Sequence, residues 1–179
     1  VISVDRLDYS KGIIKRLEGF ELLLELNPEF HGKVVMIMIV VPSRGGVERY
    51  DMMKSEVEER VGKINGKFGS IGWTPVIYSF KSLSFESLIA LYCCGDIALV
   101  TPLRDGMNLV AKEYLATRND LKGVLILSEM AGAAKELQEA IVINPNDKRD
   151  ICSALKQALQ MPLHEQERRN KIVRERLSR

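Results

Sequence analysis

The sequence has little of what several protein classes require. Only three of its 179 residues are cysteine, too few for a disulfide framework, and we interpret them as reduced core thiols of a cytoplasmic protein. The longest apolar run, 34–42, is far too short to cross a bilayer. A formal net charge of +2 is too small to indicate binding to nucleic acid or to a membrane surface. We therefore expect neither nucleic acid nor membrane among its partners.

Motifs of metal and cofactor chemistry are also missing. His31 and His164 are isolated, no cysteine and histidine cluster has ligand spacing, and neither histidine follows a strand-like run as a Ser-His-Asp triad would require. There is no Walker A motif, and 43–46, although rich in glycine, lacks G-x-G-x-x-G spacing. That segment either lines a site or forms a tight strand-to-helix loop. We expect no metal and no cofactor.

What the sequence does contain is a regular alternation of strand-like and helix-like segments. The strand-like segments are continuous apolar runs, which is typical of a parallel sheet covered on both faces. We predict strands at 1–5, 33–41, 76–78, 97–101, 123–127 and 140–143, helices at 12–26, 46–64, 84–94, 109–116, 133–137, 147–159 and 164–177, and turns at 65–66 and 69–72. The fold class is α/β: one doubly wound, Rossmann-like domain covering residues 1–179. Because Val1 already lies in a strand-like run, we expect the chain to belong to a longer protein.

The most informative segment is 104–113. It follows the apolar run 97–101, passes through a turn with Pro102 and Gly106, and enters an apolar-periodic, helix-like stretch at 109–115. A turn between the carboxyl end of a strand and the start of a helix is where open α/β sheets bind ligands. Free N–H groups and the helix dipole favour an anion there.

Two acids bracket this turn. Asp105 stands in the loop and Glu113 lies about two helical turns further on, an arrangement that suits a ligand with hydroxyls at both ends and phosphate between them. Each acid has a simpler interpretation as well. Asp105 could cap the following helix, and Glu113 could be an ordinary exposed helix residue.

The first predicted strand is followed by a second charged turn, 6–12. In a doubly wound sheet this turn lies at the same edge as 104–113, so Arg6 and Lys11 could hold a diphosphate together. The alternative is that Arg6 pairs with Asp5 or Asp8, while Lys11 is a solvated residue at the start of a helix.

Five segments, distributed along the chain, give a more specific indication. They are Arg6–Gly12, Val61–Pro75, Val100–Glu113, Leu127–Ala134 and Asn144–Pro145. In this order they resemble the α,α-trehalose-phosphate synthases, retaining glycosyltransferases of the two-domain GT-B architecture. The resemblance implies that the chain is the carboxyl-terminal, donor-binding domain, and that the amino-terminal acceptor domain is absent from it.

The resemblance also implies an activity and a site. The family transfers glucose from UDP-glucose to glucose-6-phosphate with retention and without a metal, giving trehalose 6-phosphate and UDP. Arg6 and Lys11 match the pair that holds the donor diphosphate, Asp105 the acceptor of sugar hydroxyls, and Glu113 the carboxylate on the ribose. The remaining matches are the turn of Gly106, Met107, Asn108, Leu109 and Val110, which meets the sugar and phosphates, and Leu88, an apolar contact near the uracil. At Ser82 and Leu83 the chain departs from the bacterial pattern, which has a bulkier His-Phe pair.

Two other functions remain open from the sequence. One is the donor domain of another retaining glycosyltransferase, since the spacing of Asp105 and Glu113 recurs among them. The other is a non-catalytic regulatory or scaffold paralogue in a trehalose synthase complex. Such paralogues usually lose site residues, whereas Arg6, Lys11, Asp105 and Glu113 are all present. An oligomer is compatible with the sequence, and we expect the isolated chain to be inactive because the acceptor phosphate is held mainly by the other domain.

Overall fold

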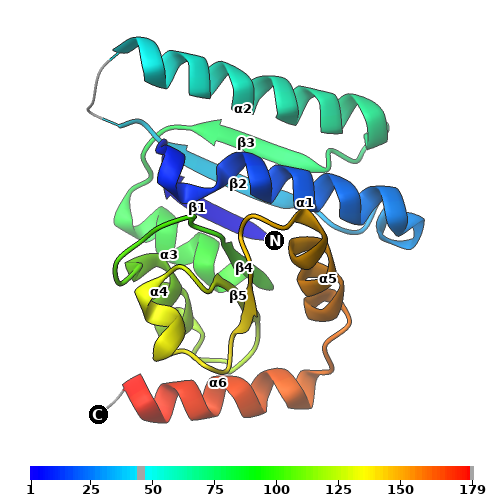
Figure 1. Ribbon diagram of the computed structural model, residues 1–179. Coiled ribbons are helices and arrows are strands. Elements are labelled where there is room, and N and C mark those ends of the chain that lie inside the picture. Colours follow the sequence, from blue (N-terminus) through cyan, green and yellow to red (C-terminus); the bar gives the residue numbers. More distant parts are fainter. Residues whose placement is uncertain (44–46, 178–179) are drawn as a thin grey trace.

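The computed structural model describes residues 1–43 and 47–177, as an α/β domain with one sheet between two layers of helices (Figure 1). The strands of the described residues are β1 (Ile2–Arg6), β2 (Met36–Val41), β3 (Val76–Phe80), β4 (Ile97–Val100), β5 (Val124–Ser128) and β6 (Ile141–Ile143). The helices are α1 (Ile13–Leu26), α2 (Val47–Phe68), α3 (Phe85–Cys94), α4 (Leu109–Thr117), α5 (Lys148–Leu159) and α6 (Leu163–Leu177), with short 3₁₀ turns η1 (Tyr9–Lys11), η2 (Pro28–Phe30) and η3 (Gly132–Lys135). Except for Ser43, the glycine-rich segment 43–46 lies outside the described residues.

The sheet confirms the predicted doubly wound topology. All strand pairs are parallel, in the order β3-β2-β1-β4-β5-β6. The chain adds strands on one side of β1 and then returns to add β4 on its other side. The order therefore reverses between β1 and β4, and the crevice beyond the carboxyl ends of these two strands is where such sheets bind ligands.

Each face of the sheet has its own apolar core. On one face α1, α2 and α5 cover residues such as Phe20, Met36 and Met38, none of which is exposed to solvent. On the other face α3, α4 and α6 cover a second cluster that includes Tyr92 and Tyr114. Burial on both faces explains why the strands read as continuous apolar runs.

Several predicted elements differ in extent. The strand predicted at 76–78 continues to Phe80, and the helix predicted at 133–137 is the 3₁₀ turn η3. Asn65 and Gly66 form no turn; they lie in the last turns of α2, which continues to Phe68. The Asn65 side-chain amide joins α2 to β3. It donates to the Val76 carbonyl (2.9 Å) and accepts from the Val76 N–H (2.9 Å). The second strand begins at Met36 rather than residue 33. The turn at 69–72 is confirmed, and Trp73 after it is buried, with Nε1 donating to the Val34 carbonyl (3.0 Å).

The prediction of core cysteines was correct for only one of the three. Cys152 is buried in α5, whereas Cys93 and Cys94 are exposed at the end of α3. The short helix α3 turns Tyr92 into the core, which leaves the two residues that follow it facing outward.

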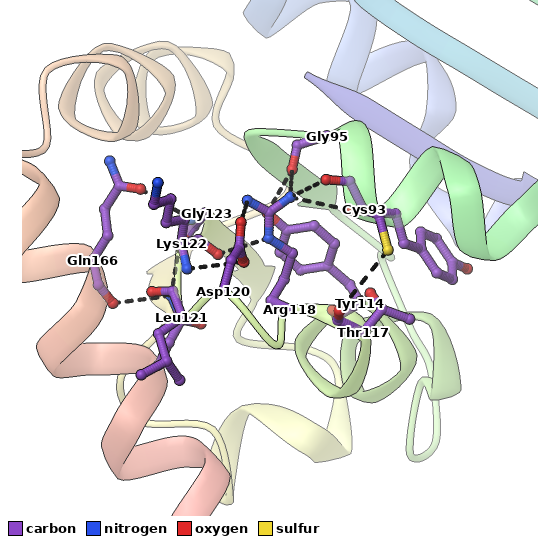
Figure 2. Close-up of polar contacts among 12 residues, drawn as sticks. Cys93, Gly95, Tyr114, Thr117, Arg118, Asp120, Leu121, Lys122, Gly123 and Gln166 are labelled. Carbon is purple, nitrogen blue, oxygen red and sulfur yellow. Dashed lines mark hydrogen bonds and ion pairs between the residues drawn. The ribbon is translucent and has the colours of Figure 1, made fainter.

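At the edge where β4 and β5 begin, Arg118 joins the ends of α3 and α4 (Figure 2). Its guanidinium is buried and donates to the carbonyls of Cys93 (2.5 Å), Gly95 (3.1 Å) and Lys122 (2.8 Å). A cation is favourable at the carboxyl end of a helix, where carbonyls lack partners. Arg118 thus connects the carboxyl ends of α3 and α4 to the loop before β5. No described helix is long and apolar enough to cross a membrane.

Candidate functional site at the carboxyl edge of the sheet

The loops that follow β1 and β4 are bonded to each other. The Ser10 carbonyl accepts hydrogen bonds from the N–H groups of Leu103 (2.7 Å) and Arg104 (3.3 Å). Asp8 shapes the first loop, since its Oδ1 accepts from the Ser10 N–H (2.8 Å) and hydroxyl (2.6 Å), and these bonds lower the pKa of Asp8. The two charged turns predicted to share an edge therefore form one structural unit.

Gly12 makes this close approach possible. Its φ of +67° lies in the left-handed region, and a Cβ atom built on it would stand 2.2 Å from the Thr101 carbonyl oxygen. Neither the conformation nor the distance is compatible with a side chain. Gly12 also begins α1, so the backbone leaves η1, passes against the end of β4 and enters the helix within a few residues.

Lys11 and Asp105 meet across the two loops. Lys11 Nζ lies 2.7 Å from Asp105 Oδ2, and both side chains are largely buried. Asp105 also accepts from the Gly106 N–H (2.8 Å) and from Asn108 Nδ2 (2.9 Å). Burial raises the pKa of Asp105, but these hydrogen bonds and the charge of Lys11 outweigh it and lower the pKa overall. Lys11 is therefore not the solvated helix-start residue of the simpler interpretation.

The cap of α4 is not Asp105, the residue that the simpler interpretation of the sequence gave for it. Asn108, not Asp105, is the N-cap: it has φ +58° and its Oδ1 accepts from the Ala111 N–H (3.1 Å). Gly106 does not have a left-handed backbone, so the turn needs no glycine there for its conformation. A Cβ on Gly106 would meet nothing within 4 Å among the described residues, so the glycine instead leaves open space beside the turn.

The start of α4 offers backbone donors. Among the residues that the structure describes, no acceptor is bonded to the N–H groups of 107–110. These groups carry the positive end of the helix dipole and suit an anion. The Gly132 N–H donates to the Gly106 carbonyl (2.6 Å), which ties the turn to the loop after β5. Met107 and Leu109 expose their side chains at this position, while Asn108 is buried.

The other predicted residues lie around this turn. Arg6 ends β1 with an exposed side chain and forms no ion pair with any described residue, so the alternative interpretation, a pair with Asp5 or Asp8, is wrong for these residues. Glu113 is on α4 with an exposed side chain, and its Oε2 accepts from the Tyr92 hydroxyl (3.2 Å). Leu88 is half-buried on α3 against the second core.

A buried ion pair behind Lys11 was missed by the sequence interpretation. Arg16 is 0% exposed; its Nη2 lies 2.7 Å from Asp5 Oδ2 and donates to the Lys11 carbonyl (3.1 Å). Its other nitrogens donate to the Thr101 hydroxyl (3.0 Å) and to the Ser3 hydroxyl. One guanidinium thus joins β1, β4 and the Lys11 backbone.

A sequence signal for this pair was available. Arg16 lies on the apolar stripe of α1, between Ile13, Leu17 and Phe20, where a charge is unfavourable unless it is paired. Asp5 interrupts the apolar first strand in the same way. Reading the two interruptions together would have predicted a buried pair beneath the first loop.

The described residues thus define a Rossmann-like domain. The cationic loop after β1 and the N-terminus of α4 lie side by side where the strand order reverses. The model of glycosyltransferase family 20 matches residues 1–179. The chain belongs to this family.

Relatives of known name agree with this assignment. The chain is 50% identical over 177 residues to a bifunctional trehalose-6-phosphate synthase/phosphatase of Thermoproteus tenax, covering 99% of this chain and 24% of that protein. It is 49% identical over 167 residues to an α,α-trehalose-phosphate synthase [UDP-forming] of Candida albicans, covering 93% of this chain and 35% of that protein.

Solved structures show the same fold. A UDP-forming α,α-trehalose-phosphate synthase from Burkholderia xenovorans matches with a TM-score of 0.95 at 44% identity, covering 98% of this chain and 40% of that one. The Escherichia coli trehalose-6-phosphate synthase bound with UDP-2-fluoro glucose matches with a TM-score of 0.93 at 43% identity, covering 98% and 40%. This chain thus spans between about a quarter and two fifths of the length of the proteins it resembles.

Proposed function

We propose that residues 1–179 are the carboxyl-terminal, donor-binding domain of a longer, cytoplasmic α,α-trehalose-phosphate synthase of GT-B architecture, and that the longer protein transfers glucose from UDP-glucose to glucose-6-phosphate. The family membership, the identity of about one half to named synthases and the fold support this proposal. A related structure holds a UDP-glucose analogue and another holds glucose-6-phosphate. The acceptor domain would lie outside this chain.

The observation that carries the proposal is the unit formed by Lys11, Asp105 and the turn of α4. Lys11 and Arg6 would neutralise the diphosphate, together with the unpaired N–H groups of 107–110. Asp105 would accept hydroxyls of the transferred sugar, and Glu113 those of the ribose. Leu88 would pack near the uracil.

The chemistry explains why cations belong here. As the bond to the sugar breaks, positive charge develops on the sugar ring and negative charge on the departing diphosphate. Positioned donors and cations that meet this negative charge stabilise the transition state more than the ground state. The ion pair with Asp105 holds the Lys11 ammonium beside the turn of α4.

The test is an assay of the complete protein with UDP-glucose and glucose-6-phosphate. The proposal predicts trehalose 6-phosphate and UDP, and weak UDP binding without turnover for residues 1–179 alone. Turnover with a different acceptor only would indicate another retaining glycosyltransferase. Absence of UDP-glucose binding by the complete protein would favour the non-catalytic scaffold, and robust synthesis by residues 1–179 alone would contradict the assignment of the acceptor site to another domain.

A further inference from the structure

Glu113 is held by a residue that the site described above does not include. Tyr92 of α3 is 0% exposed, and its hydroxyl donates to Glu113 Oε2 across 3.2 Å. Glu113 itself is exposed. One oxygen of an exposed carboxylate is thus fixed from beneath by a buried donor, which leaves the other oxygen for a ligand.

The scaffold beneath Tyr92 is rigid. Its ring meets the Tyr114 ring edge to face, with centroids 6.4 Å apart and an interplanar angle of 84°. Arg118 Nη1 donates to the Tyr92 carbonyl (3.4 Å) and the Tyr114 hydroxyl to the Gly95 carbonyl (2.9 Å), in the network that joins α3 to α4 (Figure 2). The Tyr92 hydroxyl therefore has a fixed position relative to α4.

We propose that Tyr92 is a positioning residue for the nucleoside: it orients the Glu113 carboxylate toward the two ribose hydroxyls. This inference rests on the proposed function, because it concerns the same donor site. Leu88 lies one turn before Tyr92 on the same face of α3, so a single helix would set both the apolar contact near the base and the carboxylate on the ribose. A diol is bound well by an oriented carboxylate, since each hydroxyl donates to it.

The protonation state of Tyr92 suits this role. Burial, and next the charge of Glu113, raise the pKa of Tyr92 well above its ordinary value. The hydroxyl stays protonated throughout the neutral range and donates to Glu113. It consumes one lone pair of the carboxylate and leaves the outward oxygen free to accept from the ligand.

A purely structural tyrosine would affect stability but not the recognition of ribose. The test therefore compares UDP with 2′,3′-dideoxy-UDP, which lacks both hydroxyls, by calorimetric titration of the complete protein. We expect Tyr92→Phe to weaken UDP binding about five- to tenfold, the size expected for the loss of one typical hydrogen bond, and to leave dideoxy-UDP binding unchanged. The preference for UDP over the dideoxy nucleotide should fall by the same factor.

Tyr114→Phe is the matched control. Tyr114 is equally buried on the neighbouring helix and donates to a backbone carbonyl, so its loss should lower the Tm without changing the preference for ribose. Glu113→Gln provides a second variant that leaves the buried tyrosine intact. Its loss of preference should be at least as large as that of Tyr92→Phe.

The outcomes separate the two proposals. If the unaltered protein does not bind UDP, the proposed function fails and this inference with it. If it binds UDP and Glu113→Gln loses the preference for ribose, but Tyr92→Phe keeps it, only the role of Tyr92 is wrong. An equal loss of preference in Tyr114→Phe would also overturn the inference, because the effect would then be a general loosening of α3 and α4. Retention of the preference by Glu113→Gln would overturn it regardless of how Tyr92→Phe behaves.

Discussion

Lys11 and Asp105 are 94 residues apart in the sequence, yet their side chains form an ion pair of 2.7 Å between the loops that follow β1 and β4. The pair brings together the two turns that carry the predicted diphosphate and sugar contacts. Asp105 is simultaneously bonded to the Gly106 N–H and to Asn108, so Lys11 is connected through it to the start of α4. The position of the cation is thus set by residues of the second loop.

Lys11→Ala and Arg6→Ala should each reduce turnover of the complete enzyme by about 10²–10³, the range for removing one group that stabilises developing charge. Arg6 is exposed and unpaired within the described residues, so its loss should leave the Tm unchanged. Steady-state kinetics and thermal unfolding check the two effects. Lys15→Ala, which removes a half-exposed lysine paired with Glu18, serves as the control and should change neither. Normal turnover in both site variants would contradict their roles.

Gly106→Ala and Gly12→Ala should behave differently although both glycines lie in site turns. A methyl group on Gly106 meets open space, so Gly106→Ala should leave stability unchanged but weaken UDP-glucose binding if the donor occupies that space. Gly12→Ala places Cβ 2.2 Å from the Thr101 carbonyl at a φ of +67° and should destabilise the fold itself.

Gly66→Ala supplies the matched control for both glycine variants. Gly66 lies inside α2 with nothing within 4 Å of its added Cβ, so the substitution should stabilise by roughly 0.5–1 kcal/mol. Urea unfolding and calorimetry give the comparison. Unchanged donor binding in Gly106→Ala would show that the ligand does not pass over this turn.

Arg16→Met should cost about 3–5 kcal/mol of stability at neutral pH, because it leaves the buried carboxylate of Asp5 without a partner. Burial already raises the pKa of Asp5 and Arg16 opposes this rise, so the variant raises the pKa further. A raised carboxyl pKa costs stability above the unfolded-state value of about 3.9 and costs nothing below it. The deficit of the variant should therefore shrink toward pH 4, and adding Asp5→Asn should reduce it at pH 7. A deficit that is independent of pH would contradict the buried ion pair.

Asp105→Asn should reduce stability by about 1 kcal/mol at pH 7, the size of one hydrogen bond. Because the folded-state pKa of Asp105 is lowered, its contribution is present above the unfolded-state value of about 3.9 and is lost as pH falls through the lowered folded value. The difference in the free energy of unfolding between the variant and the unaltered protein should become smaller in acid, because the unaltered protein loses stability. Denaturant unfolding at pH 7 and at pH 3 measures this difference in the free energy of unfolding. A difference that is larger at pH 3 would contradict a lowered pKa of Asp105.

The sequence predicted the elements whose signal is local. Continuous apolar runs located the strands, and the helix predicted at 84–94 is α3, with Ser84 as its N-cap accepting from the Ser87 N–H (3.2 Å). Asn65 was misread because Asn-Gly is a common turn dipeptide, whereas its side chain pairs with a strand start 11 residues away. Local propensity does not encode such a contact.

The site was predictable as a set of residues but not as a network. The edge shared by Lys11 and Asp105 followed from topology, since parallel strands place their carboxyl ends together. That the two would pair, that Asn108 would adopt a left-handed backbone to cap α4, and that Tyr92 would reach Glu113 depend on distances between elements that only packing fixes.

The account depends most on where the diphosphate binds, and a crystal structure of the complete protein with UDP tests it most directly. The account predicts phosphate oxygens within about 3 Å of Lys11 Nζ and of the backbone N–H groups between Met107 and Val110, as expected for charge-assisted hydrogen bonds, with both ribose hydroxyls on Glu113. A nucleotide bound with its phosphates away from the crevice between β1 and β4 would contradict it.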